Sequence, residues 1–358
     1  MQGGIFLVLI DIYGKIEPRI ISSKLGVGIC NLSFDWITGL QADLYEEVLI
    51  YNHFLEFCTN QDDDNDLKYK KYDLDQIVES MEWQEEGKSS MQIIAEHLIE
   101  IQVIDFDKSM LQLKNRHMDS PTCEPQYTRK FIEFCSNVQS SNKAQKVIPS
   151  KIPFSIYNSD DLNAKPLILQ FVKLKSLSNL SSDISVKEYT DASISSLEYI
   201  GNLIDRFISS DEDFWLLDYI ISSMFSDKEL NAYHIFKVMT LIEMLIVNPR
   251  SNGITQGEIE KKLPQFLSDR IEVSKRTLFS ELMRKLRNKI GHGDFKAVNK
   301  LLENYRQIFM NEFWFDEYEY SIENWTYINI CIQLDYALNE ILWLMLSDKP
   351  KLLSIQKG

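Results

Sequence analysis

The apolar residues of the first half of the chain fall into short runs typical of strands. Residues 4–13 (GIFLVLIDIY) are rich in β-branched and aromatic side chains and end at Gly14, which predicts a buried strand. Residues 17–22 are the predicted neighbour of that strand, with Gly14 and Lys15 in the turn. Residues 166–173 (PLILQFVK) predict a further strand.

Helical and irregular segments lie between these runs. Residues 35–58 and residues 74–104 show helical periodicity, whereas the acidic residues 62–66 predict a solvated loop. Residues 105–150 are polar and contain three prolines, so they predict no ordered element. The pattern therefore indicates an α+β domain over residues 1–180.

A serine-rich stretch at residues 176–185 predicts a linker, and the residues after it predict a series of consecutive helices. A second domain is therefore expected over residues 185–350, with an all-α bundle as its fold. The predicted helices span residues 187–209, 212–225, 227–247, 255–266, 273–291, 295–310 and 322–347.

Two local patterns support this helical half. Ser226 and Glu229 form a capping box that predicts the start of the 227–247 helix. In the 273–291 helix, a stripe of apolar side chains recurs at steps of four residues, a spacing that predicts a buried face. The stripe consists of Leu278, Leu282, Leu286 and Ile290.

Composition narrows the class of protein. Apolar residues make up 44% and charged residues 25% of the 358 positions, so the chain can bury a core. The 38 Lys and Arg residues against 53 Asp and Glu residues give a net charge of −15, which argues against a scaffold that binds nucleic acid through bulk positive charge. Five scattered cysteines without a C-x-x-C pair predict neither a disulfide framework nor a zinc site. Because the apolar runs 5–10 and 341–346 are far shorter than the roughly 20 residues of a membrane span, we expect a cytoplasmic protein without a membrane segment.

Several familiar signatures fail in this chain. The Gly87-Lys88-Ser89 string lacks the earlier glycine of a phosphate-binding loop, and residues 26–31 lack the third glycine of a dinucleotide fingerprint. The aspartates of residues 62–66 resemble the first ligands of a calcium loop, but Leu67 occupies the position that requires glycine. No metal site and no cofactor are predicted.

One constellation carries chemistry: residues 286–293 (LRNKIGHG), which close the 273–291 helix. Arg287 and His292 are separated by four residues, and Asn288 follows Arg287 directly. A histidine can move a proton near neutral pH, and an arginine can stabilise charge that builds up on a phosphate. Together with an asparagine that donates to phosphate or orients the imidazole, these groups suffice to cleave RNA through its own 2′-hydroxyl without a metal.

The helix places constraints on this site. Five residues along a continuous helix put Arg287 and His292 roughly 140° apart, whereas Asn288 and His292 share a face. We expect Gly291 and Gly293 to loosen or end the helix, so that His292 can swing towards Arg287.

A local basic patch accompanies the motif. Residues 271–300 contain eight cations and three anions, a balance of 8 − 3 = +5 in an acidic chain. Such a patch beside a phosphate site favours contact with the RNA backbone. The predicted RNA-binding side chains are Arg284, Lys285, Lys289 and Lys296.

Glu243 is a carboxylate within the apolar run 240–246 (TLIEMLI), where an unpaired charge is costly. Arg287 or another cation of the motif helix is its predicted partner, which would make Glu243 a supporting residue of the site or simply half of a structural ion pair. His53, His97, His117 and His234 are interpreted as packing residues.

The Arg287-Asn288…His292 motif in an all-α half resembles the HEPN superfamily, and the string RNKIGHG is most similar to its Apea-like branch in phage-defence proteins. The resemblance covers about residues 187–350 and implies a metal-independent endoribonuclease that acts as a toxin or antiviral effector of abortive infection. It also implies a homodimer in which two motifs face each other across a cleft. The resemblance does not extend to the N-terminal half, for which we expect a regulatory role in binding a trigger or inhibitor.

Two other interpretations remain open. The helical half could be a non-catalytic interaction module or a toxin partner regulated by a separate nucleotidyltransferase. Alternatively, the N-terminal half could sense a cyclic-oligonucleotide messenger, which would require a parallel, Rossmann-like sheet.

Overall fold

The computed structural model divides the chain into two compact units, each of which is described by itself. The first comprises Met1–Cys135 and Lys146–Ile208, and the second comprises Ser136–Gln145 and Ser209–Gly358. The structure describes residues 6–9, 15–31, 52–53, 75, 78–79, 85–97, 99–103, 131, 134–135, 137–138, 155–156, 186–223, 230–247, 257–310 and 322–357. The predicted strand at 166–173, the predicted 62–66 loop, the serine-rich stretch at 176–185, His117 and most of the predicted 35–58 helix lie outside these residues.

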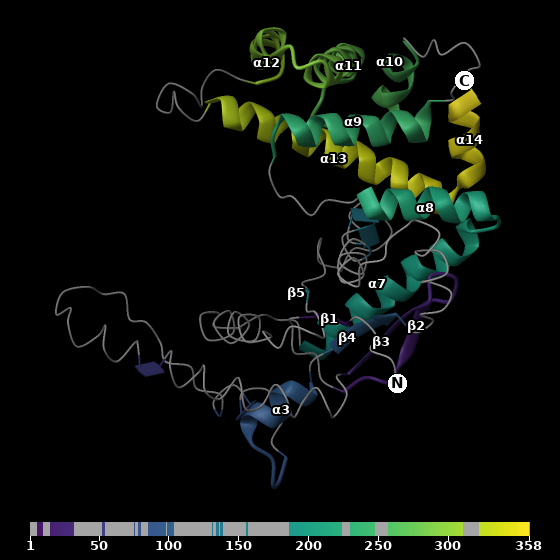
Figure 1. Ribbon diagram of the computed structural model, residues 1–358, viewed down its shortest axis with the longest axis vertical. Coiled ribbons are helices and arrows are strands. Elements are labelled where there is room, and N and C mark those ends of the chain that lie inside the picture. Colours follow the sequence, from purple (N-terminus) through teal and green to yellow (C-terminus); the bar gives the residue numbers. More distant parts are fainter. Residues whose placement is uncertain are drawn as a thin grey trace, which may run out of the picture. The chain divides into compact units, whose positions relative to one another are not determined.

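The first unit contains an antiparallel sheet with the strand order β2-β3-β4-β1-β5 (Figure 1). Its strands are β1 (Phe6–Leu9), β2 (Arg19–Ser22), β3 (Val27–Asn31), β4 (Ile99–Val103) and β5 (Ser155–Ile156). The expected hairpin between the first two strands is wrong, because β1 pairs with β4 and β5 whereas β2 pairs with β3. All described strand pairs are antiparallel, so the parallel sheet that a cyclic-oligonucleotide sensor would require is not seen in the described residues.

Helix α7 (Val186–Phe207) packs on β2 within the same unit (Figure 1). A Cβ atom at Gly201 would lie 1.8 Å from the carbonyl oxygen of Ile21, so only glycine permits this close approach. One turn later, the Asp205 carboxylate accepts hydrogen bonds from the Ser22 and Ser23 hydroxyls at 2.5 and 2.7 Å. These contacts place α7 with the sheet, in the unit that ends at Ile208.

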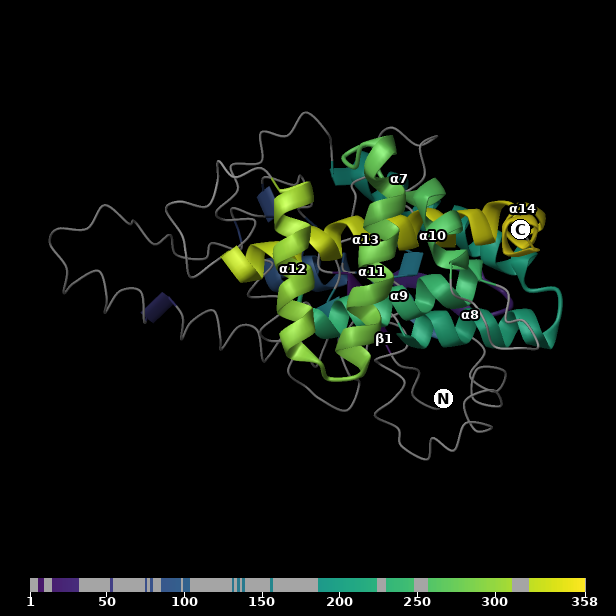
Figure 2. The same ribbon diagram turned by 90° about the horizontal axis from the view of Figure 1, so that it is seen from above.

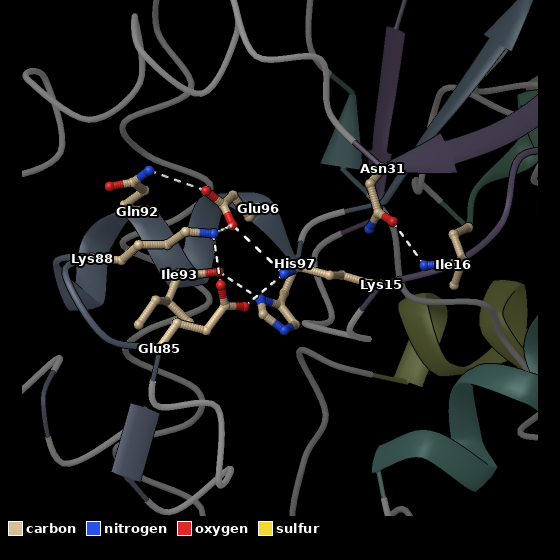
Figure 3. A network of polar contacts seen from close by, with 9 residues as sticks. All are labelled: Lys15, Ile16, Asn31, Glu85, Lys88, Gln92, Ile93, Glu96 and His97. Atoms are coloured by element: carbon tan, nitrogen blue, oxygen red, sulfur yellow. Dashed lines mark hydrogen bonds and ion pairs between the residues drawn. The ribbon is translucent and has the colours of Figure 1, made fainter.

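A cluster of ion pairs ties the segment before β2 to helix α3 (Ser90–Glu96), as Figure 3 shows. Lys15 lies 2.6 Å from Glu85, and Lys88 lies 2.7 Å from Glu85 and 2.6 Å from Glu96. Beside them, burial lowers the pKa of His97, whose Nδ1 is 2.7 Å from the Ile93 carbonyl oxygen. His97 is therefore a packing residue, as predicted.

The second unit is mostly helical. Its helices are α8 (Asp211–Ser223), α9 (Ala232–Ile246), α10 (Glu258–Lys262), α11 (Arg276–Gly291), α12 (Phe295–Phe309), α13 (Ile322–Ser347) and α14 (Lys349–Lys357). Short 3₁₀ turns at Leu263–Phe266 and Val273–Lys275 precede α11. The α+β character of the first half and the helical character of the second are thus present as predicted.

The helices of this unit form two crossed layers: α11 and α12 run side by side across α9 and α13 (Figures 1 and 2). Apolar side chains of these helices are almost fully buried between the layers, and they form the core on which the site is built. The rings of Phe279, Tyr305 and Phe309 pack together between α11 and α12. The Tyr305 hydroxyl also donates to Asn329 of α13 at 2.7 Å, which joins the two layers.

Two local predictions need correction. Helix α9 begins at Ala232 with Asn231 as its N-cap, not at the predicted Ser226 capping box, because the Asn231 side chain accepts from the backbone N–H groups of Tyr233 and His234. The buried stripe of α11 also differs from the predicted one, since Leu278 is 38% exposed. The buried apolar residues of α11 are Phe279, Leu282, Met283 and Leu286.

Among the described helices, the stretch Asn324–Ser347 of α13 is long and apolar enough to cross a membrane, and 56% of its most apolar window is buried in the protein. A core helix of a globular protein shows the same properties.

Candidate active site

Helix α11 carries the motif and is anchored at both ends. At its start, the Arg276 guanidinium donates to the carbonyl oxygens of Ile271 and Ser268 at 3.1 and 3.3 Å. At its end, the backbone N–H of Gly293 donates to the carbonyl oxygen of Ile290, and that of Asp294 donates to Lys289, both at 3.0 Å. This pair of bonds is a Schellman motif, with Gly293 in the left-handed region at φ +69°. The motif residues therefore stand at a firmly terminated helix end.

Arg287 lies at the centre of the contacts between α11 and α9. Its Nη2 is 3.0 Å from the Glu243 carboxylate, which is the pairing predicted from the sequence. Its Nη1 donates to the Asn288 side-chain oxygen at 3.0 Å. Because that oxygen accepts a bond, the NH2 group of Asn288 is left to donate to an anion. The structure thus brings together three of the predicted site residues: Arg287, Asn288 and Glu243.

The Glu243 carboxyl group is partly buried beside two arginines, and both features affect its pKa. Burial raises the pKa of the Glu243 carboxyl group, and the positive charges of Arg287 and Arg284 only partly oppose this rise. The side chains of Glu243 and Arg287 remain 25% and 28% exposed. The pair is therefore only partly buried, and an approaching phosphate can compete for the guanidinium.

His292 does not join this cluster. Its backbone keeps right-handed helical angles, and its N–H donates to the Asn288 carbonyl oxygen at 3.1 Å, so the helical turn continues through residue 292. No hydrogen bond or ring contact between His292 and Arg287 occurs in the described part of the chain. The expected swing of His292 towards Arg287 is therefore wrong, because the left-handed residue is Gly293, one position too late to redirect the imidazole. His292 is exposed and lies on the side of Asn288.

Gly291 is the last residue of α11, so the helix ends at this glycine as expected, and Gly293 completes the helix end in the left-handed region. A Cβ atom at Gly291 would lie 2.9 Å from Cε2 of Phe236 on α9, so its small size makes room for an aromatic ring.

The predicted basic patch is smaller than the sequence count suggests. Arg284 pairs with Glu260 at 2.7 Å, Lys289 pairs with Asp294 at 2.8 Å, and Lys285 pairs with Glu281. The pairs of Lys285 and Lys289 are exposed, and exposed ion pairs contribute little to stability, so RNA phosphates can replace the carboxylates at little cost. Lys296 is exposed on α12.

Phe236 is a residue of this cluster that the motif in the sequence does not include. The guanidinium carbon of Arg287 lies 5.6 Å from the centre of its ring, within cation–π range. A signal was available, because Phe236 and Glu243 are seven residues apart and therefore share one face of a helix. His234, in contrast, is a packing residue: it is buried, and its Nε2 is 2.8 Å from Asp335 of α13.

Other kinds of centre are not indicated in the described residues. No group of three or more His, Cys, Asp or Glu side chains within the described ranges could hold a metal ion. Cys135 and Cys331 are buried and form no disulfide.

Comparisons of the chain with protein-family models, with curated proteins and with solved structures find no match.

Proposed function

We propose that the second unit is a metal-independent endoribonuclease of the HEPN type, in which Arg287, Asn288 and His292 act on the RNA phosphodiester. The observation that carries this proposal is the Arg287 cluster, in which a partly exposed guanidinium is oriented by Glu243 and Asn288 at the end of α11. A pre-oriented guanidinium can stabilise the charge that develops on a phosphate during 2′-hydroxyl attack.

His292 supplies the proton transfer in this proposal. Its imidazole is exposed, so RNA can reach it, and it shares a helix face with Asn288. Because it lies apart from Arg287 on its own helix, the proposal assigns the complete site to a dimer, in which two copies of the motif face one shared cleft. Exposed apolar side chains on the helices of the site, Leu278 at 38% and Phe295 at 64%, support burial against a second copy.

The proposed biological role is that of a growth-arresting effector, with antiviral abortive infection as its setting. The first unit would then hold the nuclease inactive or bind its trigger. The alternative of a non-catalytic interaction module predicts an intact motif but no RNA cleavage.

The direct test incubates the purified full chain with total RNA in the presence of EDTA and compares it with His292→Ala. We expect fragments ending in 2′,3′-cyclic phosphate from the wild type only. Equal fragment patterns from the two proteins, with EDTA present, would reject the proposed catalytic assignment.

A further inference from the structure

Helices α9 and α11 face each other through two matched pairs of residues. On α9, Phe236 and Glu243 lie two turns apart on one face. On α11, Arg287 and Gly291 lie one turn apart on one face. Glu243 contacts Arg287, whereas Phe236 contacts Arg287 and packs where Gly291 has no side chain.

The Phe236 ring is fixed by this arrangement. One edge of the ring lies so close to Gly291 that a methyl group there would stand 2.9 Å from Cε2, closer than two carbon atoms approach without displacement. The ring centre lies 5.6 Å from the guanidinium carbon of Arg287. Thr240, between Phe236 and Glu243, donates its hydroxyl to the Phe236 carbonyl oxygen at 2.8 Å.

Arg287 depends on such support because its hydrogen bonds leave it incompletely held. Nη1 and Nη2 have partners, but Nε is buried and has no hydrogen-bond partner among the described contacts. A long side chain with an unmet donor would sample other rotamers unless packing opposed this. The aromatic ring supplies that packing, together with attraction to the cation.

We propose that Phe236 is a positioning residue: its ring holds the Arg287 guanidinium in the orientation that binds the scissile phosphate. The ring fits against α11 only because residue 291 is glycine. This inference rests on the proposed ribonuclease function. It adds to that function a requirement for an aromatic side chain at residue 236 and for glycine at residue 291.

The test uses the full chain with Phe236→Leu, Phe236→Tyr and Gly291→Ala, and it has two independent readouts. The first is the pKa of the Glu243 carboxyl group without RNA, measured by ¹³C NMR of glutamate-labelled protein and assigned with Glu243→Gln. The second is the single-turnover rate of RNA cleavage. Tyr233→Leu is the matched control, because Tyr233 is an aromatic residue of the same helix that is 61% exposed.

If Phe236 positions Arg287, Phe236→Leu and Gly291→Ala move the guanidinium away from Glu243, and the Glu243 pKa rises further. Cleavage falls roughly tenfold or more, since one oriented donor is lost. Phe236→Tyr keeps a ring over the cation, so the Glu243 pKa and the cleavage rate stay close to those of the wild type. A loss of core volume alone would not explain this difference between the tyrosine and leucine variants. Tyr233→Leu leaves both unchanged.

An unchanged Glu243 titration in Phe236→Leu would overturn the positioning role, whatever the nuclease does. A raised pKa with a full cleavage rate would overturn the catalytic part of the inference. If Phe236→Leu raises the pKa of Glu243 but the wild type cleaves no RNA, the ribonuclease function and the phosphate contact are rejected. That result would still support the positioning of Arg287 by Phe236.

Discussion

Glu243 and Arg287 are in contact at 3.0 Å, and yet the pKa of Glu243 is raised, because burial of the carboxylate outweighs the attraction of Arg287 and Arg284. A folded-state pKa above the unfolded value means that the native state binds more protons. The contribution of Glu243 to stability is therefore largest below its ordinary pKa of 4.5 and is lost as the pH rises through the folded value. The pair orients the site and adds little to stability.

The pH dependence of Glu243→Gln tests this balance. As the pH rises above 4.5, the wild type should lose free energy of unfolding relative to Glu243→Gln, which has no proton to lose. Urea unfolding at several pH values measures the difference, and Glu281→Gln, at an exposed pair, serves as the control. A wild type that gains stability over the variant with rising pH would show that attraction to the arginines dominates.

Gly201→Ala should disrupt the packing of α7 on the sheet. The new methyl group would meet the Ile21 carbonyl oxygen at 1.8 Å, and backbone on both sides must move. We expect a loss of about 3 kcal/mol in the free energy of unfolding, at the upper end of overpacking effects. Asn202→Ala, at an exposed position of the same helix, should change it by less than about 0.5 kcal/mol. A Gly201→Ala chain that unfolds like the wild type would contradict the close approach of α7 to β2.

Gly293→Ala tests the Schellman end of α11. No atom lies within 4 Å of a Cβ at this position, so the cost comes only from the left-handed backbone, and we expect about 1 kcal/mol. Gly293→Asn should cost less, because asparagine tolerates this conformation. The two variants should also reduce RNA cleavage in the same order, since they loosen His292. If alanine proved as stable as asparagine, the positive φ of residue 293 would not hold.

Asp213 provides a test of the second unit that is remote from the motif. Burial alone would raise the pKa of the Asp213 carboxyl group. The ion pair with Lys349 and the hydrogen bonds from Ser209 outweigh burial and lower the pKa of this carboxylate to about 2. Its stabilising effect is full above the ordinary value of 3.8 and is lost as the pH falls towards 2. Asp213→Asn should therefore destabilise the chain at pH 7 and less at pH 3, whereas the exposed Asp211→Asn should do little at either. A penalty that is equal at both pH values would contradict the role of the charge.

Much of the helical half is predictable from the sequence, because amphipathic periodicity is a local property. The 322–347 helix coincides with α13, and the 295–310 helix lies within one residue of α12. The start of α9 was misplaced because Ser226 and Asn231 are both good caps, and only the hydrogen bonds of Asn231 distinguish them.

The sheet was harder to predict because its pairing is nonlocal. In β4, Ile99, Ile101 and Val103 alternate with Glu100 and Gln102, which is a strand pattern. The prediction of helical periodicity over residues 74–104 includes these residues and is wrong for them. Residues 26–31 resemble an incomplete dinucleotide fingerprint, and the glycines before and within β3 weaken its strand pattern. Nothing local indicates that β3 and β1 pair with a strand that lies about 70 and about 90 residues further along the chain, respectively.

The contact between Arg287 and Glu243 is predictable from the sequence, but the geometry around it is not. Arg287 and Glu243 are separated by 44 positions, and a buried carboxylate in an apolar helix was enough to predict their pairing. The position of His292 depends on which of two glycines takes a positive φ, and the space for Phe236 depends on helix packing. Neither can be read from a single sequence.

The most direct test of the ribonuclease function compares cells that express the wild type with cells that express His292→Ala at equal levels. Both cultures are grown with and without phage as the trigger, and their total RNA is analysed for 2′,3′-cyclic phosphate ends. We expect growth arrest and such fragments with the wild type only. Intact RNA and equal growth in both, with and without phage, would contradict it and would favour an interaction module in which the Arg287 cluster is structural.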